Sequence, residues 1–187
     1  MKILVTGGAG FIGSNFIKYI LKKYPDYQII NLDKLTYCGN LDNLRDIEND
    51  PRYQFIKGDI CDSNLVDKII SQKPEVVVNF AAESHVDRSI LDSNPFLKTN
   101  ILGTYTLLET VKKYRIGRFI QISTDEVYGS INEDSFREMD LLNPSNLYSS
   151  SKAAADIIAR SYYITYKMPK NSFGKNKRLF LLQLWDF

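Results

Sequence analysis

The chain is poor in the residues that build metal centres and disulfide frameworks. Its 187 residues include one histidine, His85, and two cysteines, Cys38 and Cys61. A single histidine does not supply a His-based metal cage. Two cysteines without C-x-x-C spacing make neither a disulfide framework nor a redox motif. We therefore expect no metal, and we interpret both cysteines as small apolar side chains.

Long apolar runs are missing as well. No segment approaches the roughly 20 consecutive apolar residues that a membrane-spanning helix needs. The first residues lead straight into an apolar strand-like segment and lack the pattern of a signal peptide. We therefore expect a protein without a membrane span, located in the cytoplasm.

An excess of charge is confined to one end of the chain. The formal net charge is +2, and residues 167–187 contain five basic side chains against one acidic side chain. Subtracting this local +4 from the total leaves −2 for the rest of the chain. Because the basic character lies in a tail and not on a folded face, the sequence does not favour a nucleic-acid partner.

Strand-like and helix-like segments alternate through most of the chain, which predicts an α/β fold with a doubly wound parallel sheet of the Rossmann type. We place this domain over residues 1–169 and assign no strand to residues 170–187, an atypical tail without clear periodicity. The expected strands are 2–6, 28–32, 53–57, 75–80 and 118–123. The expected helices are 11–23, 41–47, 63–71 with Ser63 as its cap, 95–114 and 146–167.

Glycines crowd the junction between the first strand and the first helix. Gly7, Gly10 and Gly13 give the spacing G-x-x-G-x-x-G, and Gly8 adds the spacing G-x-G-x-x-G. Such spacings allow a tight turn, close approach to a pyrophosphate and close packing of the helix on the strand. The helix N-terminus then offers free N–H groups to the phosphates. A turn that binds no ligand is the alternative.

An acidic residue closes the second strand, twenty residues after Gly13. Asp33 is suited to accept hydrogen bonds from both ribose hydroxyls and to repel a 2′-phosphate, which favours NAD over NADP. The cofactor-binding residues that we expect in this part of the chain are Gly7, Gly10, Phe11, Ile12, Gly13, Asp33, Lys34, Leu35 and Thr36.

Two further pairs follow the third and fourth strands. Asp59 and Ile60 stand where contacts to adenine are expected, although a turn or helix-capping aspartate is nearly as good an interpretation. Ala81 and Ala82 are small enough to let a cofactor lie against the backbone.

A tyrosine and a lysine lie four residues apart in the last expected helix. Tyr148 and Lys152 share one face of that helix, and a nearby ammonium stabilises a phenolate that acts as general base. The pattern Y-x-x-x-K is common, and a surface pair is its usual explanation. Downstream of a dinucleotide turn, it resembles the extended short-chain dehydrogenase/reductase superfamily.

Two adjacent carboxylates, Asp125 and Glu126, follow the fifth strand directly. Alone they are best interpreted as exposed loop acids, but next to a cofactor site they supply an acid and a base. The segments 124–129 (TDEVYG), 81–89 (AAESHVDRS) and 33–37 (DKLTY) together resemble the dTDP-glucose 4,6-dehydratases.

The resemblance implies a redox-neutral dehydration of a nucleoside-diphosphate glucose to its 4-keto-6-deoxy form, with NAD as cofactor. Tyr148, assisted by Lys152, then serves as the base at the 4-hydroxyl during oxidation at C4, and Thr124 hydrogen-bonds the same oxygen. Glu126 removes the C5 proton and Asp125 protonates the departing 6-hydroxyl, before reduction at C6.

The resemblance also implies further contacts. Ser84 matches a position that faces substrate and cofactor, His85 one that faces substrate, and Asn100 a polar position beside the cofactor; Tyr148 and Lys152 also hold the cofactor. The alternatives are a helix cap or a satisfied polar contact for His85, and an ordinary helix residue for Asn100. A related epimerase or decarboxylase, or a non-catalytic NAD-binding fragment, are the alternative functions.

The resemblance ends near residue 169. Members of the family continue into a C-terminal part that grips the nucleotide-sugar, whereas residues 170–187 do not follow that pattern. We therefore expect an incomplete sheet on the C-terminal side, a missing substrate domain, and a frame-shifted or prematurely ended reading frame. The family's dimers imply a homodimer formed by the two long helices.

Overall fold

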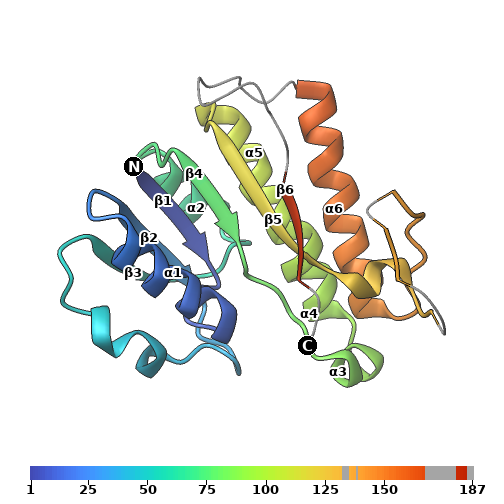
Figure 1. Ribbon diagram of the computed structural model, residues 1–187. Helices are drawn as coiled ribbons and strands as arrows, with labels where there is room; N and C mark the ends of the chain where they lie inside the picture. Colours follow the sequence, from blue (N-terminus) through green and yellow to red (C-terminus); the bar gives the residue numbers. More distant parts are fainter. Residues whose placement is uncertain (132–134, 138, 167–179, 185–187) are drawn as a thin grey trace.

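A six-stranded sheet, parallel throughout, forms the centre of the molecule (Figure 1). The computed structural model describes residues 1–131, 135–137 and 139–166, together with the backbone of 180–184. The strand order is β3-β2-β1-β4-β5-β6, which is the order of a doubly wound dinucleotide-binding fold. The strands are β1 (Lys2–Thr6), β2 (Gln28–Asp33), β3 (Tyr53–Lys57), β4 (Val76–Asn79), β5 (Arg118–Thr124) and β6 (Phe180–Leu184).

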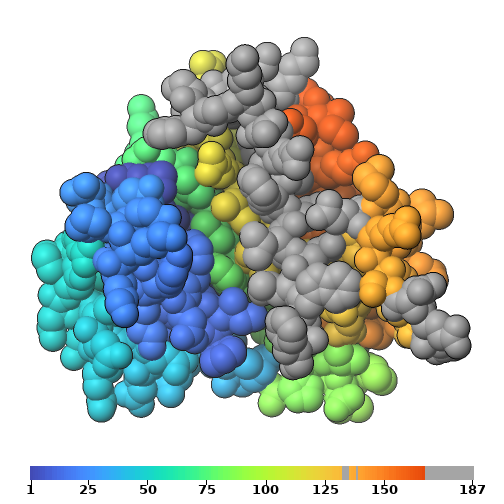
Figure 2. Space-filling view, in the orientation of Figure 1, coloured from blue at the N-terminus to red at the C-terminus, as the bar shows by residue number. Residues whose placement is uncertain are grey.

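Helices and single helical turns connect the strands. In the space-filling view, the segments from β1 to β3 and the segment containing α6 lie on opposite sides of the molecule (Figure 2). Among the described residues, no helix is both long and apolar enough for a membrane span. The helices are α1 (Phe11–Lys23), η1 (Leu41–Ile47), α2 (Ser63–Ile70), α3 (Val86–Leu91), α4 (Asn94–Phe96), η2 (Leu97–Gly103), α5 (Thr104–Tyr114), η3 (Asp125–Tyr128) and α6 (Leu147–Tyr166).

Both faces of the sheet are covered, which confirms the predicted doubly wound architecture. Successive side chains of a strand point to opposite faces. Accordingly, Ile3 and Val5 pack in a cluster with Ile17 of α1, whereas Leu4 packs in the other cluster with α2, α5 and α6. The central strand β4 is buried along its whole length, as its continuous apolar run predicts.

A buried polar network joins three neighbouring strands. Asn79, at the end of β4, accepts a hydrogen bond from Thr6 of β1 and donates one to Gln121 of β5 at 2.9 Å. All three side chains are almost fully buried. Their hydrogen bonds to one another replace the bonds to water that burial removes. The network fixes the carboxyl ends of β1 and β4 relative to the middle of β5.

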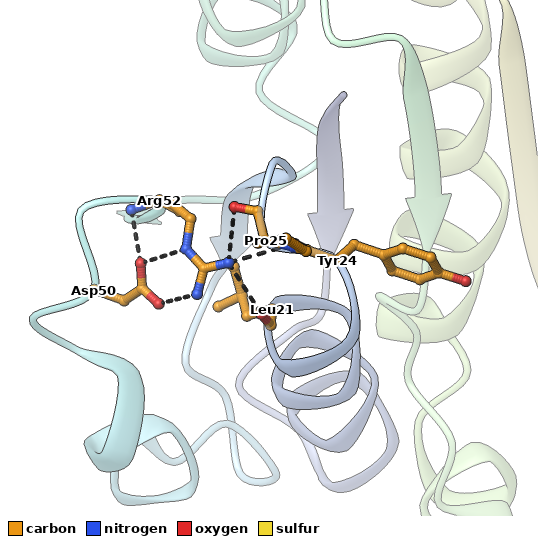
Figure 3. Close-up of polar contacts among 5 residues, drawn as sticks. All are labelled: Leu21, Tyr24, Pro25, Asp50 and Arg52. Carbon is orange, nitrogen blue, oxygen red and sulfur yellow. Dashed lines mark hydrogen bonds and ion pairs between the residues drawn. The ribbon is translucent and has the colours of Figure 1, made fainter.

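Arg52, in the turn before β3, anchors the end of α1 (Figure 3). Its guanidinium pairs with Asp50 and also donates to the carbonyls of Leu21, Tyr24 and Pro25 at 3.0–3.3 Å. These carbonyls lie at or just beyond the last turn of α1, where backbone acceptors lack partners within the helix. The contact ties the C-terminal end of α1 to the turn before β3.

Several details differ from the expectations. The cap of α2 is Asp62 and not Ser63, because the Asp62 carboxylate accepts from the amides of Asn64 and Leu65. The expected helix 95–114 consists of α4, a π-helical segment η2 and α5 in succession. Neither α3 nor η3 was expected.

The tail expectation was wrong for residues 180–184. This segment forms β6 and pairs with β5 in parallel, with Gln121 opposite Leu181. Pairing satisfies the backbone groups of β5 that an open edge would leave exposed, and this is a reason for a strand that periodicity does not reveal. Residues 167–179 and 185–187, the rest of the expected tail, lie outside the described residues.

Candidate functional site

One cavity of about 620 Å³ opens at the carboxyl ends of the strands, where doubly wound sheets place their ligands. Its size falls in the range of small-molecule and cofactor sites. It brings together most of the residues singled out in the sequence. The predicted residues that line it are Gly7, Gly10, Phe11, Ile12, Gly13, Asp33, Lys34, Thr36, Asp59, Ile60, Ala81, Ala82, Ser84, Thr124, Glu126, Tyr148 and Lys152.

The glycine turn has little room for side chains except at one position. Gly7 has a φ of +69°, and a Cβ there would lie 2.6 Å from the backbone nitrogen of Ala81. A Cβ on Gly13 would lie 2.5 Å from the carbonyl oxygen of Gly7. At Gly10 the same atom would meet only the Gly7 oxygen, at 3.4 Å. The turn is therefore closely packed behind Gly7 and Gly13 and open beside Gly10.

The N-terminus of α1 presents backbone donors to this opening. Gly10 is the N-cap and supplies no capping side chain, and the first amide bonded to the helix is that of Ser14, which donates to Gly10 O at 3.0 Å. The amides of Phe11, Ile12 and Gly13 precede this bond. They therefore have no partner within the helix, and the helix dipole makes this end attractive to anions.

Backbone amides fix the Asp33 carboxylate at the end of β2. Ala9 N donates to one of its oxygens and Leu35 N to the other, both at 2.8 Å. The side chain is 8% exposed and lines the cavity. Each carboxylate oxygen accepts more than one hydrogen bond, so that Asp33 keeps capacity for hydroxyl donors in the cavity.

An ion pair closes the same end of the cavity. Lys34 Nζ lies 2.8 Å from Asp59 Oδ2, and the Cys61 amide donates to Asp59 Oδ1 at 2.9 Å. Burial raises the pKa of the Asp59 carboxyl, but these two hydrogen bonds outweigh it and hold the pKa below its ordinary value. Asp59 is therefore charged at neutral pH and is already paired within the protein.

Lys152 enters the cavity from α6, with Tyr148 one helical turn before it. The ammonium donates to the carbonyl of Ile122 on β5 at 2.5 Å, and the side chain is 4% exposed. Burial lowers the pKa of Lys152 to about 8, against the opposing charge of Asp156. A lysine with this pKa is able to gain or lose a proton near neutral pH.

The end of β5 contributes the third group. The Thr124 hydroxyl accepts from the Glu126 amide at 3.4 Å, which starts the short helix η3 and turns Glu126 toward the cavity. Glu126 Oε2 accepts a hydrogen bond from Asn146 at 3.0 Å. Tyr148, Lys152, Thr124 and Glu126 thus line the same cavity as the glycine turn.

Four predicted residues lie outside the lining. Asp125 accepts a hydrogen bond from the Thr124 hydroxyl at 3.3 Å, and Leu35, with a φ of +57°, bonds to Asp33 through its amide. His85 precedes α3, makes no side-chain cap bond, and places its exposed ring 6.4 Å from that of Tyr37. The fourth is Asn100.

Asn100 makes hydrogen bonds to other residues of the protein. Its amide nitrogen donates to Glu83 O and to the Ser151 hydroxyl, and its oxygen accepts from Glu83 N. These bonds occupy the buried side chain and tie the loop after β4 to α6. Thr99, its neighbour in η2, lines the cavity instead.

Sequence reasoning missed several lining residues. Glu83 contributes a half-buried carboxylate whose pKa burial raises above its ordinary value. Its position two residues after Ala81 was a usable signal. Asn146 does not line the cavity but holds Glu126, and it was also missed, although a polar residue before a helix after Pro144 is typical of an N-cap. The other missed lining residues are Leu32, Cys38, Gly39, Asn43, Gly58, Phe80, Thr99, Ile122 and Ser123.

Comparisons with known proteins agree with this geometry. The family model described as GDP-mannose 4,6 dehydratase matches residues 4–178. Low-salt glycan biosynthesis protein Agl12 of Haloferax volcanii is 51% identical over 180 residues, which cover 93% of this chain and 57% of that protein. The dTDP-glucose 4,6-dehydratase of Haemophilus influenzae is 49% identical, with 90% and 53% covered.

A solved structure gives the same result. The dTDP-glucose 4,6-dehydratase of Bacillus anthracis in complex with NAD superimposes with a TM-score of 0.83 at 52% identity. The match covers 90% of this chain and 52% of that one, so that the chain spans about half the length of the relatives it matches. On the extent of the model match and on these identities, the chain belongs to the GDP-mannose 4,6 dehydratase family and is similar to its dTDP-glucose 4,6-dehydratases.

Proposed function

We propose that residues 1–169 form the NAD-binding domain of a dTDP-glucose 4,6-dehydratase, which converts the sugar nucleotide to its 4-keto-6-deoxy form. The observation that carries the proposal is that the glycine turn, Asp33 and the three side chains Glu126, Tyr148 and Lys152 line one and the same cavity. The glycine turn alone would support only dinucleotide binding. The side chains of Glu126, Tyr148 and Lys152 alone would not indicate a cofactor.

The residues present fit NAD. The space beside Gly10 and the free amides of Phe11, Ile12 and Gly13 suit a pyrophosphate. Asp33, fixed by two amides, is suited to both ribose hydroxyls and repels a 2′-phosphate. Asp59 and Ile60 border the adenine end. The relative from Bacillus anthracis was solved with NAD.

Bound NAD would supply reversible oxidation of the sugar, so that the net reaction is a dehydration. Tyr148 takes the proton of the 4-hydroxyl, because the Lys152 ammonium one helical turn away stabilises a phenolate. The Thr124 hydroxyl hydrogen-bonds the same oxygen. Glu126, held by Asn146, takes the proton at C5.

The acid that protonates the departing 6-hydroxyl is Asp125 in this proposal. Asp125 is joined to Thr124 by a hydrogen bond and follows β5 directly. Ser84 lines the cavity, and the proposal assigns substrate contacts to Ser84 and to the next residue, His85, whose ring is exposed. This assignment gives separate groups to the three proton transfers.

A direct assay tests the proposal. Purified chain is incubated with dTDP-glucose and NAD, and the 4-keto-6-deoxy product is identified by mass spectrometry. Glu126→Gln and Tyr148→Phe should abolish product, because each removes a proton acceptor at near-constant shape, whereas Lys18→Gln, on α1 and outside the cavity lining, should not. Product that is unaffected by Glu126→Gln and Tyr148→Phe would contradict the assigned roles.

A second candidate function is an NAD-binding fragment without turnover. It is favoured by the chain's coverage of about half of its relatives, because binding energy from the nucleotide end of a substrate contributes to positioning. NAD that protects the chain against thermal unfolding, without product, would support this candidate. Absence of NAD protection would contradict both candidates.

The proposal extends to a homodimer in the cytoplasm without a nucleic-acid partner. Large apolar side chains are exposed on neighbouring helices, and such clusters mark interaction sites more often than isolated exposed residues do. A second copy using the same surface would cover them on both subunits. The residues concerned are Leu102, Tyr105, Ile157, Ile164 and Tyr166.

A further inference from the structure

A further ionisable group lies on α6, one helical turn after Lys152. Asp156 follows Lys152 by four residues, hence on the same side of the helix, and is 3% exposed. It does not line the cavity. A buried carboxylate costs folding free energy unless it is paired or hydrogen-bonded, so its partners require an explanation.

The partners come from β5. The Ser123 hydroxyl donates to Asp156 Oδ2, while Asp156 Oδ1 is buried and has no hydrogen-bond partner among the described residues. Lys152 donates to the carbonyl of Ile122, the residue before Ser123. Two consecutive residues of β5 therefore hold the lysine and the aspartate of α6, immediately before Thr124.

We propose that Asp156 is a positioning residue for Lys152: its carboxylate, fixed by Ser123, balances the charge of the buried ammonium, which the carbonyl of Ile122 holds near the end of β5. The catalytic part of this role rests on the proposed function, whereas the electrostatic interaction between the two groups does not. Asp156 acts through Lys152 and contacts neither cofactor nor substrate.

The charges of the two groups support this role. Burial lowers the pKa of Lys152 to about 8 and the charge of Asp156 opposes this shift. Burial raises the pKa of Asp156 to about 6, opposed by the Ser123 hydrogen bond and by Lys152. The neutral Ser123 hydroxyl faces Asp156 from β5, and Lys152 is the charged group that acts on it from α6. Both groups are therefore charged between about pH 6 and 8.

A titration of Lys152 in the full chain tests the proposal without requiring turnover. The chain is labelled with ¹³C at lysine Cε, and the Lys152 signal is identified as the one lost in Lys152→Gln. Its shift should change in two steps, near pH 8 for Lys152 itself and near pH 6 for Asp156. In Asp156→Asn the lower step should vanish and the upper step should move down by about one pH unit, because the stabilising negative charge is gone.

Two further variants make the test specific. Asp156→Glu keeps the charge and should restore the lower step. Ser123→Ala removes the hydrogen bond that favours the charged carboxylate and should move the lower step to higher pH. A wild-type curve with one step, or an upper step that does not move in Asp156→Asn, would overturn the proposal.

The wild-type and Ser123→Ala curves decide the outcome if Asp156→Asn does not fold. A role limited to stability would lower the melting temperature of Asp156→Asn and leave the Lys152 titration unchanged, which would also overturn the proposal. Failure of NAD to protect the wild-type chain would contradict the proposed function alone, because the titration does not depend on it.

Discussion

Asn146 Nδ2 donates a hydrogen bond to Glu126 Oε2 across 3.0 Å. The oxygen of the same amide accepts from Ser149 N at 2.7 Å and so caps the start of α6. One side chain therefore sets the position of Glu126 relative to the helix that carries Tyr148. Asn146, to which no proton transfer is assigned, therefore links the two candidate bases Glu126 and Tyr148.

The two roles of Asn146 are separable by substitution. Asn146→Asp keeps an acceptor for Ser149 N but replaces the donor to Glu126 by a second carboxylate. We expect at least a tenfold loss of turnover, about 1.4 kcal/mol, with little change in the free energy of unfolding. Asn146→Ala loses the cap as well and should cost about 1 kcal/mol of stability. Equal turnover in Asn146→Asp and wild type, measured with urea unfolding alongside, would show that Glu126 does not need this contact.

The glycine turn offers a matched pair of substitutions. A methyl at Gly10 meets only an ordinary contact, so Gly10→Ala should fold normally but narrow the phosphate site. We expect NAD affinity to fall about tenfold or more, measured by calorimetry, because each tenfold corresponds to about 1.4 kcal/mol. Gly13→Ala places its methyl 2.5 Å from Gly7 O and should lower stability by about 1–3 kcal/mol. If Gly10→Ala binds NAD as tightly as the wild type, the phosphates do not lie at this turn.

Burial of Lys152 makes stability depend on pH. Its pKa is about 8 in the folded chain against an ordinary value of 10.5, so the unfolded chain binds the proton more strongly between these values. Stability from this group therefore rises as pH increases from 8 toward 10.5. Relative to Lys152→Met, the wild type should gain up to about 3 kcal/mol over this range. Urea midpoints of both proteins at pH 8 and pH 10 provide the measurement, and a constant difference between them would contradict the expectation.

The exposed apolar side chains of η2, α5 and α6 predict self-association. Ile157 of α6 is 55% exposed, and Tyr19 of α1, on the other face of the sheet, is 54% exposed. We expect Ile157→Glu to lower the molar mass measured by light scattering from dimer to monomer, whereas Tyr19→Glu should leave it unchanged. A charged residue inside an apolar interface is costly. A monomeric wild type, or dissociation by both variants, would show that this surface is not the interface.

The strands and the cavity were predictable because their signals are local. β1 and β3 have the predicted bounds, and β2 and β5 each extend one residue further, since each strand is a short apolar run that ends at a turn. The glycine spacing and Asp33 likewise need no knowledge of distant residues. Such local patterns are predictable because backbone geometry alone determines which side chains share a face.

Features that depend on packing were not predictable. Asp62 and Ser63 both have capping side chains, and only the path of the chain decides that Asp62 caps α2. Strand β6 exists through its pairing with β5, and a pairing partner leaves no periodic signal. The contact between Asn146 and Glu126 joins residues twenty positions apart. The length of the intervening segment does not predict that Asn146 comes back to Glu126.

The backbone that packs against Gly7 affects the order in which parts of the chain fold. The turn and Asp33 both lie within the first 33 residues, but the backbone against which Gly7 packs belongs to Phe80 and Ala81. The strand β1 reaches its partner β4 only when Ile3 pairs with Val76. Contacts between residues so distant in sequence form slowly. The cavity beside Gly7 is therefore complete only after β4 has been synthesised and has paired with β1, and under the proposed function NAD would stabilise the chain only from that point on.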